Sequence, residues 1–207
     1  LGSIYSQINQ FDKAILLFNE SINKFPNSIE AYSNLASVLV IKGRIDTAKK
    51  ILIKAIELNP NYLKSYGNLA GIYVGEGDFG EAELLLRKSI EKNPNDINTL
   101  VNLACVLKDL GKIKEAEKFL RNALEINPTY EKVLTNLGAV LNELEKTDEG
   151  ERYLRKALNI NPASLMALNN LGNILSKKNN YNEAELCYRK AIDIKSDFSL
   201  AYNNLAT

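Results

Sequence analysis

Residues 63–96 read LKSYGNLAGIYVGEGDFGEAELLLRKSIEKNPND, and the rest of the chain repeats this pattern. The prolines mark the period, since each lies 34 residues after the one before: Pro26, Pro60, Pro94, Pro128 and Pro162. A fixed period of this length indicates an array of one supersecondary unit. Within residues 63–96, apolar and small residues stand at the spacing of one α-helical stripe: Tyr66, Leu69, Ala70 and Tyr73.

A second helical stripe follows in the same repeat, at Phe79, Ala82, Leu86 and Ser89. The turn between the two helices is predicted at Gly77 and at the corresponding residues of the other repeats: Asn9, Gly43, Gly111, Glu145 and Asn179. Gly and Asn tolerate the left-handed backbone that such a turn needs, so the turn at Glu145 is expected to be the loosest. Ser196 replaces the repeated proline, and the last second helix is therefore expected to run slightly further.

The repeat resembles the tetratricopeptide repeat (TPR) family, through Tyr66, Leu69, Ala70, Tyr73, Gly77, Ala82, Leu86 and Pro94. The resemblance covers the whole chain and implies an all-α fold, a TPR-type helix-turn-helix solenoid that forms a right-handed superhelix. We expect one array over residues 1–207, with full repeats at 29–62, 63–96, 97–130, 131–164 and 165–198 and partial repeats at 1–28 and 199–207. Because both ends cut the pattern, we expect a fragment of a longer protein, whose exposed end columns favour end-to-end self-stacking.

The composition argues against several classes of partner. The 207 residues carry a formal net charge of +1, which lacks the basic excess that nucleic-acid binding requires. The sequence contains no apolar run of about 18 residues and no signal-peptide pattern. We therefore expect a cytoplasmic protein that binds neither nucleic acid nor membrane.

The sequence predicts no catalytic residue, metal site or cofactor. Histidine, the commonest general base, is absent. Cys105 and Cys187 cannot by themselves form a four-thiolate metal site, and we interpret them as reduced core thiols. Gly75, Gly77 and Gly80 have the spacing of a dinucleotide-binding motif, but that motif needs a preceding strand, and here the glycines surround a helix–helix turn.

One column outside the apolar stripe holds asparagine in all six repeats that contain it: Asn34, Asn68, Asn102, Asn136, Asn170 and Asn204. The TPR resemblance implies that this face lines the concave groove, and a carboxamide can both donate to and accept from a peptide backbone. The ladder is similar to the one in the TPR array of O-linked N-acetylglucosamine transferase. The alternative is a structural ladder, in which the asparagines bond to neighbouring helices.

Three further groove-side candidates lie near the ladder: Lys64, Lys132 and Asn173. Glu and Arg four residues apart on the second helices, such as Glu117 and Arg121, are interpreted instead as local surface ion pairs. We predict a non-enzymatic protein–protein interaction scaffold that binds an extended peptide segment in its concave groove. Two alternatives stay open: a substrate-recruiting region of a larger transferase, for example a glycosyltransferase, and a purely structural spacer.

Overall fold

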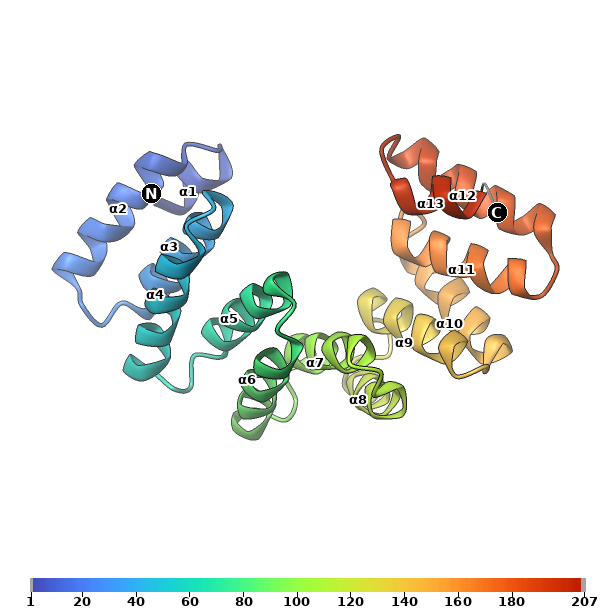
Figure 1. The fold of residues 1–207 in the computed structure, drawn as a ribbon, viewed down its shortest axis with the longest axis horizontal. Coiled ribbons are helices and arrows are strands. Elements are labelled where there is room, and N and C mark those ends of the chain that lie inside the picture. The colour runs from blue at the N-terminus through green and yellow to red at the C-terminus, as the bar shows by residue number, and fades with distance from the viewer. Residues whose placement is uncertain (1, 206–207) are drawn as a thin grey trace. The chain divides into compact units, whose positions relative to one another are not determined.

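The computed structural model describes residues 2–205, and within them the chain forms thirteen α-helices and no β-strand. The helices, labelled in Figure 1, are α1 (Gly2–Gln7), α2 (Phe11–Lys24), α3 (Ile29–Ile41), α4 (Ile45–Leu58), α5 (Leu63–Glu76), α6 (Phe79–Lys92), α7 (Ile97–Asp109), α8 (Ile113–Ile126), α9 (Glu131–Glu143), α10 (Thr147–Ile160), α11 (Leu165–Lys177), α12 (Tyr181–Ile194) and α13 (Ser199–Leu205). Odd-numbered helices are the first helices of the repeats and even-numbered ones the second. The predicted all-α repeat fold is confirmed.

The chain divides into two compact units, residues 1–99 and residues 100–207, with the boundary inside α7. In unit 1, α3 packs on α4, α5 packs on α6, and α3 also contacts α5. In unit 2, α9 packs on α10, α11 packs on α12, and α11 contacts both α9 and α13. The first helices α3, α9 and α11 therefore each contact their own second helix and the first helix of the next repeat.

The core consists of the columns that the repeat alignment identifies. The leucine column is buried at Leu35, Leu69, Leu103, Leu137 and Leu171, and the small-residue column that follows it is buried as well. On the second helices the alanine column is buried, with Ala48, Ala82 and Ala116 fully inaccessible. The apolar stripes thus face each other, as the 3.6-residue periodicity predicts.

Six turns share one backbone conformation, with φ between 60° and 80° at Asn9, Gly43, Gly77, Gly111, Glu145 and Asn179. The expectation that the turn at Glu145 is the loosest stays a prediction. Glu145 N lies 3.2 Å from Asn142 O, the longest of the six equivalent bonds. Lys146 N donates to Leu141 O at 2.9 Å, closely matching the bond from Lys112 N to Leu107 O at 2.8 Å in the preceding repeat. The backbone hydrogen bonds close the turn, and glutamate adopts the left-handed conformation there.

Each repeated asparagine before proline ends a second helix and forms a small turn. Asn59 has extended backbone, and its Oδ1 accepts a hydrogen bond from Asn61 N at 2.9 Å. The same bond recurs at Asn93, Asn127 and Asn161. The expected extension of α12 is wrong, because α12 ends at Ile194 with 14 residues, the length of α4. Lys195 is extended without a proline after it, since Phe198 N bonds to Lys195 O at 3.1 Å and closes the turn.

In unit 2, glycines let helices approach very closely. A Cβ placed on Gly138 would lie 2.5 Å from Leu154 Cγ, and one on Gly150 would lie 2.9 Å from Gly138 O. A Cβ on Gly172 would lie 2.4 Å from Tyr188 Cε1. These distances are shorter than van der Waals contact, so α9–α10 and α11–α12 pack in a way that only glycine allows at these positions.

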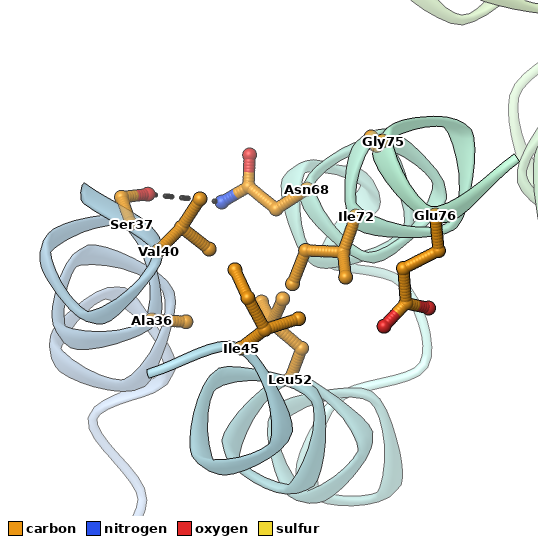
Figure 2. A pocket seen from close by; sticks show the side chains of 11 residues that line it. Ala36, Ser37, Val40, Ile45, Leu52, Asn68, Ile72, Gly75 and Glu76 are labelled. Atoms are coloured by element: carbon orange, nitrogen blue, oxygen red, sulfur yellow. Dashed lines mark hydrogen bonds between the residues drawn. The ribbon is translucent and has the colours of Figure 1, made fainter. Parts of the chain in front are cut away.

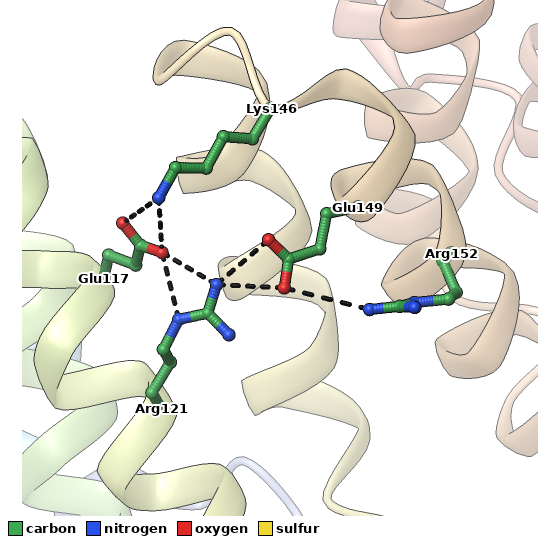
Figure 3. Close-up of polar contacts among 5 residues, drawn as sticks. All are labelled: Glu117, Arg121, Lys146, Glu149 and Arg152. Atoms are coloured by element: carbon green, nitrogen blue, oxygen red, sulfur yellow. Dashed lines mark hydrogen bonds and ion pairs between the residues drawn. The ribbon is translucent and has the colours of Figure 1, made fainter.

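Ion pairs join successive second helices of unit 2 (Figure 3). Arg121 Nη2 lies 2.8 Å from Glu117 Oε1 within α8 and 2.9 Å from Glu149 Oε1 on α10. Lys146, at the α9–α10 turn, also contacts Glu117 at 2.9 Å. The predicted local pair therefore exists, but its arginine also binds the next repeat, which the interpretation as local surface pairs missed.

The same arrangement recurs one repeat later. Lys178 contacts Glu151 at 2.7 Å, and Arg155 contacts Glu183 on α12 at 2.7 Å. Lys178 donates to Glu151 and lowers the pKa of that carboxyl, while the pKa of Lys178 rises to about 12 through its bonds to Asp148 and Glu151. Burial works against a low pKa at Glu117, but hydrogen bonds from Lys146 and Arg121 hold it below its usual value.

Candidate functional site

The structure places the ladder asparagines outside the core of each unit. Asn102 is exposed, and the other five are half-buried: Asn34, Asn68, Asn136, Asn170 and Asn204. The leucines that follow four of them, at 35, 69, 103 and 137, are at most 3% exposed. Core packing therefore does not account for the asparagine column, in agreement with the sequence-based prediction.

In unit 1, two predicted residues meet. Lys64 Nζ, on α5, donates to Asn34 Oδ1 on α3 at 3.3 Å. Asn68 Nδ2 lies 3.5 Å from Ser37 Oγ, at the outer limit of a hydrogen bond. Among the described residues, Asn68 Oδ1 has no hydrogen-bond partner. The α5 asparagine thus keeps an acceptor that the fold does not use.

Beside Asn68, a groove of about 440 Å³ opens between α3, α4 and α5 (Figure 2). We call it the α3–α5 groove. Its lining residues are Ala36, Ser37, Val40, Ile45, Leu52, Gly67, Asn68, Gly71, Ile72, Gly75 and Glu76. Sequence reasoning missed this groove, although Gly67, Gly71 and Gly75 are spaced four apart on one helix face and were a signal for it.

In unit 2, some of the ladder asparagines are hydrogen-bonded within the fold. Asn136 Nδ2 donates to Lys132 O at 2.8 Å, and Asn136 Oδ1 lies 3.5 Å from Cys105 Sγ. The Lys132 side chain is exposed. Among the described residues, neither Asn102 nor Asn170 uses its carboxamide in a hydrogen bond. The ladder therefore contains both bonded and unused carboxamides.

The last ladder residue belongs to a cluster that links helices. Asn204 Nδ2, on α13, donates to Asn169 Oδ1 at 3.0 Å and to Asn173 Oδ1 at 2.9 Å. Tyr188 OH donates to the same Asn173 oxygen at 2.8 Å. Asn173 was predicted on the groove side, but its oxygen already accepts two hydrogen bonds. These bonds join α13 and α12 to α11 within the fold, which is the arrangement that the structural alternative describes.

The described residues contain no cluster suited to a metal ion, and no helix among them is long and apolar enough to cross a membrane. Both cysteines are free thiols, as predicted, with Cys187 buried and Cys105 half-buried. Burial raises the pKa of both thiols, which disfavours the reactive thiolate.

Solved structures with a similar fold support the repeat assignment. YrrB, described as a TPR protein with an unusual peptide-binding site, is 24% identical with a TM-score of 0.66 over 92% of this chain and 98% of its own. A chain of the APC/C hetero-tetramer Cut9–Hcn1 is 19% identical with a TM-score of 0.85, over 99% of this chain but only 40% of its own. PilF of Pseudomonas aeruginosa is 22% identical with a TM-score of 0.70, over 85% of this chain and 88% of its own. At these identities the similarity establishes the fold alone.

Comparison at the level of sequence identifies a family. None of the curated proteins compared with the chain matches it in sequence. The similarity of the ladder to that of O-linked N-acetylglucosamine transferase stays a prediction. A family model described as the C-terminal domain of cilia and flagella-associated protein 70, a TPR domain, matches residues 1–200, and the chain therefore belongs to this family.

Proposed function

We propose that the chain is a non-enzymatic scaffold that binds an extended protein segment through the asparagine-bearing faces of its first helices. One observation carries this proposal: the carboxamides of Asn102 and Asn170 make no hydrogen bond among the described residues. A ladder kept for helix–helix bonding alone would not need asparagine at these two positions. Each unused carboxamide offers a donor and an acceptor to a peptide backbone.

The proposed mechanism divides the ladder between two roles. Asn204, bonded to Asn169 and Asn173, holds α13 to α11 and fixes the surface. Asn102 and Asn170, both in unit 2, retain free acceptors and donors and pair with the N–H and C=O groups of the bound segment. Because backbone groups are common to all peptides, this pairing sets affinity and orientation without selecting a sequence.

The comparisons support a protein partner. TPR-type repeats are protein-interaction modules, and the YrrB relative is described as having a peptide-binding site. The family takes its description from a cilia- and flagella-associated protein, so a component of those organelles is the first partner to test. The expected cytoplasmic location stays a prediction.

The test removes the two unused carboxamides. Peptides of about 12 residues, displayed on phage, are selected on the full chain, and the tightest is measured by fluorescence anisotropy. We expect Asn102→Ala with Asn170→Ala to weaken binding about 5- to 100-fold, since each lost hydrogen bond is worth roughly 0.5–1.5 kcal/mol. The melting temperature should not change. Unchanged affinity with a lowered melting temperature would establish a structural ladder instead.

A further inference from the structure

The α3–α5 groove has an apolar interior with room for a side chain. Val40 is 37% exposed there, and Ile45, Leu52 and Ile72 complete the apolar lining (Figure 2). A cavity of about 150 Å³ with such a lining holds a benzene-sized molecule. The groove, at about 440 Å³, has room for one aliphatic side chain and part of the backbone that carries it.

Packing does not explain the glycines that keep this groove open. A Cβ placed on Gly71 or Gly75 would meet no atom within 4 Å, and neither residue has a positive φ. Glycine inside a helix lowers its stability relative to alanine. In unit 2, the glycines at 138 and 172 are required by close neighbours, whereas those on α5 are required by none. The missing side chains of Gly71 and Gly75 therefore leave the groove open.

The charges at the groove favour an uncharged occupant. Glu76 is its charged lining residue, and Lys49 Nζ donates to both of its carboxylate oxygens, at 2.9 and 3.0 Å. The carboxylate is therefore neutralised from within the fold. A charged side chain entering the groove would lose hydration and find no counter-charge.

Asn68 stands at the rim of the groove. Figure 2 shows its Oδ1 pointing away from Ile45 and Leu52, and this oxygen has no partner among the described residues. A backbone N–H of an extended segment can donate to Asn68 Oδ1 while the adjoining side chain enters the groove. The polar rim and the apolar interior thus fit consecutive parts of one peptide.

We propose that the α3–α5 groove is the specificity pocket of the bound segment and takes one Leu, Ile or Met side chain from the partner protein. This inference rests on the proposed function, because Asn68, a ladder residue of the same unit, holds the backbone while the groove selects the residue. Gly71 is the specificity-determining position, since any larger side chain there would occupy the groove.

The test uses the peptides selected on the wild-type chain. We expect Leu, Ile or Met at one fixed position of the enriched sequences. Replacing that residue by Ala or by Lys in the peptide should weaken binding at least about 10-fold, because burial of such a side chain is worth that much. Gly71→Leu should weaken binding of the aliphatic peptide to a similar extent without lowering the melting temperature. Gly80→Leu, outside the groove on α6, is the matched control and should change affinity less than about 2-fold.

The outcomes separate the two proposals. If peptides bind and depend on Asn102 and Asn170, but a Lys peptide binds as well as the aliphatic one, the groove proposal is overturned and the scaffold proposal stands. Equal affinity of a folded Gly71→Leu variant would overturn the groove proposal in the same way. If no peptide is enriched, both proposals fall. The peptide substitutions are measured on the wild-type chain, so the test survives even if Gly71→Leu fails to fold.

Discussion

Glycine serves opposite purposes on α5 and on the α9–α10 pair. On α5 of unit 1, Gly71 and Gly75 border open space, and the result is a groove beside Asn68. In unit 2, Gly138 and Gly150 bring α9 and α10 into contact so close that a Cβ on either would collide with its neighbours. A small residue in a repeat therefore indicates either an open groove or close helix packing, and the position of the neighbouring helix determines which.

The units also differ in how their second helices are joined. Lys49 and Ile53 of α4 occupy the positions that Glu117 and Arg121 hold two repeats later on α8. Lys49 therefore pairs with Glu76 at the groove, whereas Glu117 and Arg121 join α8 to the α9–α10 region. The network thus begins at Glu117 on α8, whereas the equivalent position on α4 supplies Lys49, which neutralises Glu76 beside an apolar pocket.

The largest effect is expected from adding a side chain where the glycines pack tightly. Gly138→Leu should lower the free energy of unfolding by about 3 kcal/mol, because Leu154 and the α10 backbone must move. Gly71→Leu adds the same side chain in open space and should not lower the free energy of unfolding. Urea unfolding followed by circular dichroism checks both, and equal losses would refute the contrast between the units.

The network should have the next largest effect. Glu117→Gln is expected to cost about 1–2 kcal/mol, because the Glu117 side chain is only 12% exposed and two cations lose their shared carboxylate. Glu185→Gln is the matched control, since that pair with Arg189 is about half-exposed and local, and it should cost less than about 0.5 kcal/mol. Added salt should shrink the first cost. A loss as small as that of the control would show that the network stabilises nothing.

Acid should act on the same pairs. The folded state holds the pKa of Glu117 below its ordinary value of 4.5, so the folded state binds fewer protons than the unfolded chain. The stability that this carboxylate contributes is complete above pH 4.5 and is lost as the pH falls through the folded-state pKa. Thermal melts across this range should show the decline, and Glu117→Gln should make it shallower. An unchanged slope in the variant would exclude Glu117 as a cause.

Beside the ladder, Asn173→Ala is expected to cost about 1–2 kcal/mol, since Tyr188 and Asn204 both lose their acceptor. Asn170→Ala removes an unused carboxamide and should leave the free energy of unfolding within about 0.5 kcal/mol. The melting temperatures of the two variants measure this difference. Equal values would mean that the bonded and unused asparagines are not distinct classes.

The smallest effect is a gain. Gly71→Ala should stabilise the chain by about 0.5–1 kcal/mol, because alanine restricts the unfolded chain and favours the helix. Gly77→Ala should instead lower the free energy of unfolding, since φ at Gly77 is 80° and alanine there is strained. Chemical denaturation of both variants decides between them, and a loss at Gly71 would mean that α5 needs this glycine for packing.

Much of the fold was predictable because every repeat places the same kinds of residue in the same columns. The buried leucines, the left-handed turns and the helix order all follow from one period of 34 residues. One error came from treating a single residue as decisive. Ser196 was expected to lengthen the second helix of its repeat, but a backbone hydrogen bond from Phe198 N to Lys195 O holds the common geometry.

The candidate site was only partly predictable. The asparagine column was visible as a column, but its division into bonded and unused carboxamides depends on neighbours such as Tyr188 and Ser37 that the alignment does not pair. The α3–α5 groove depends on glycines that occur in one repeat alone, so a comparison among the repeats does not reveal it. The fold depends on residues that all repeats share, whereas the pocket depends on residues of one repeat.

The most direct test of the account observes the asparagine side chains during binding. A chain labelled with ¹⁵N at asparagine is titrated with the tightest selected peptide, and the side-chain amide signals are followed by NMR, with single substitutions assigning each signal. We predict that the signals of Asn102 and Asn170, both in unit 2, shift with the same saturation curve while that of Asn204 stays nearly unchanged. If a bound peptide left both signals in place, the ladder would not be the binding surface and the central proposal would be contradicted.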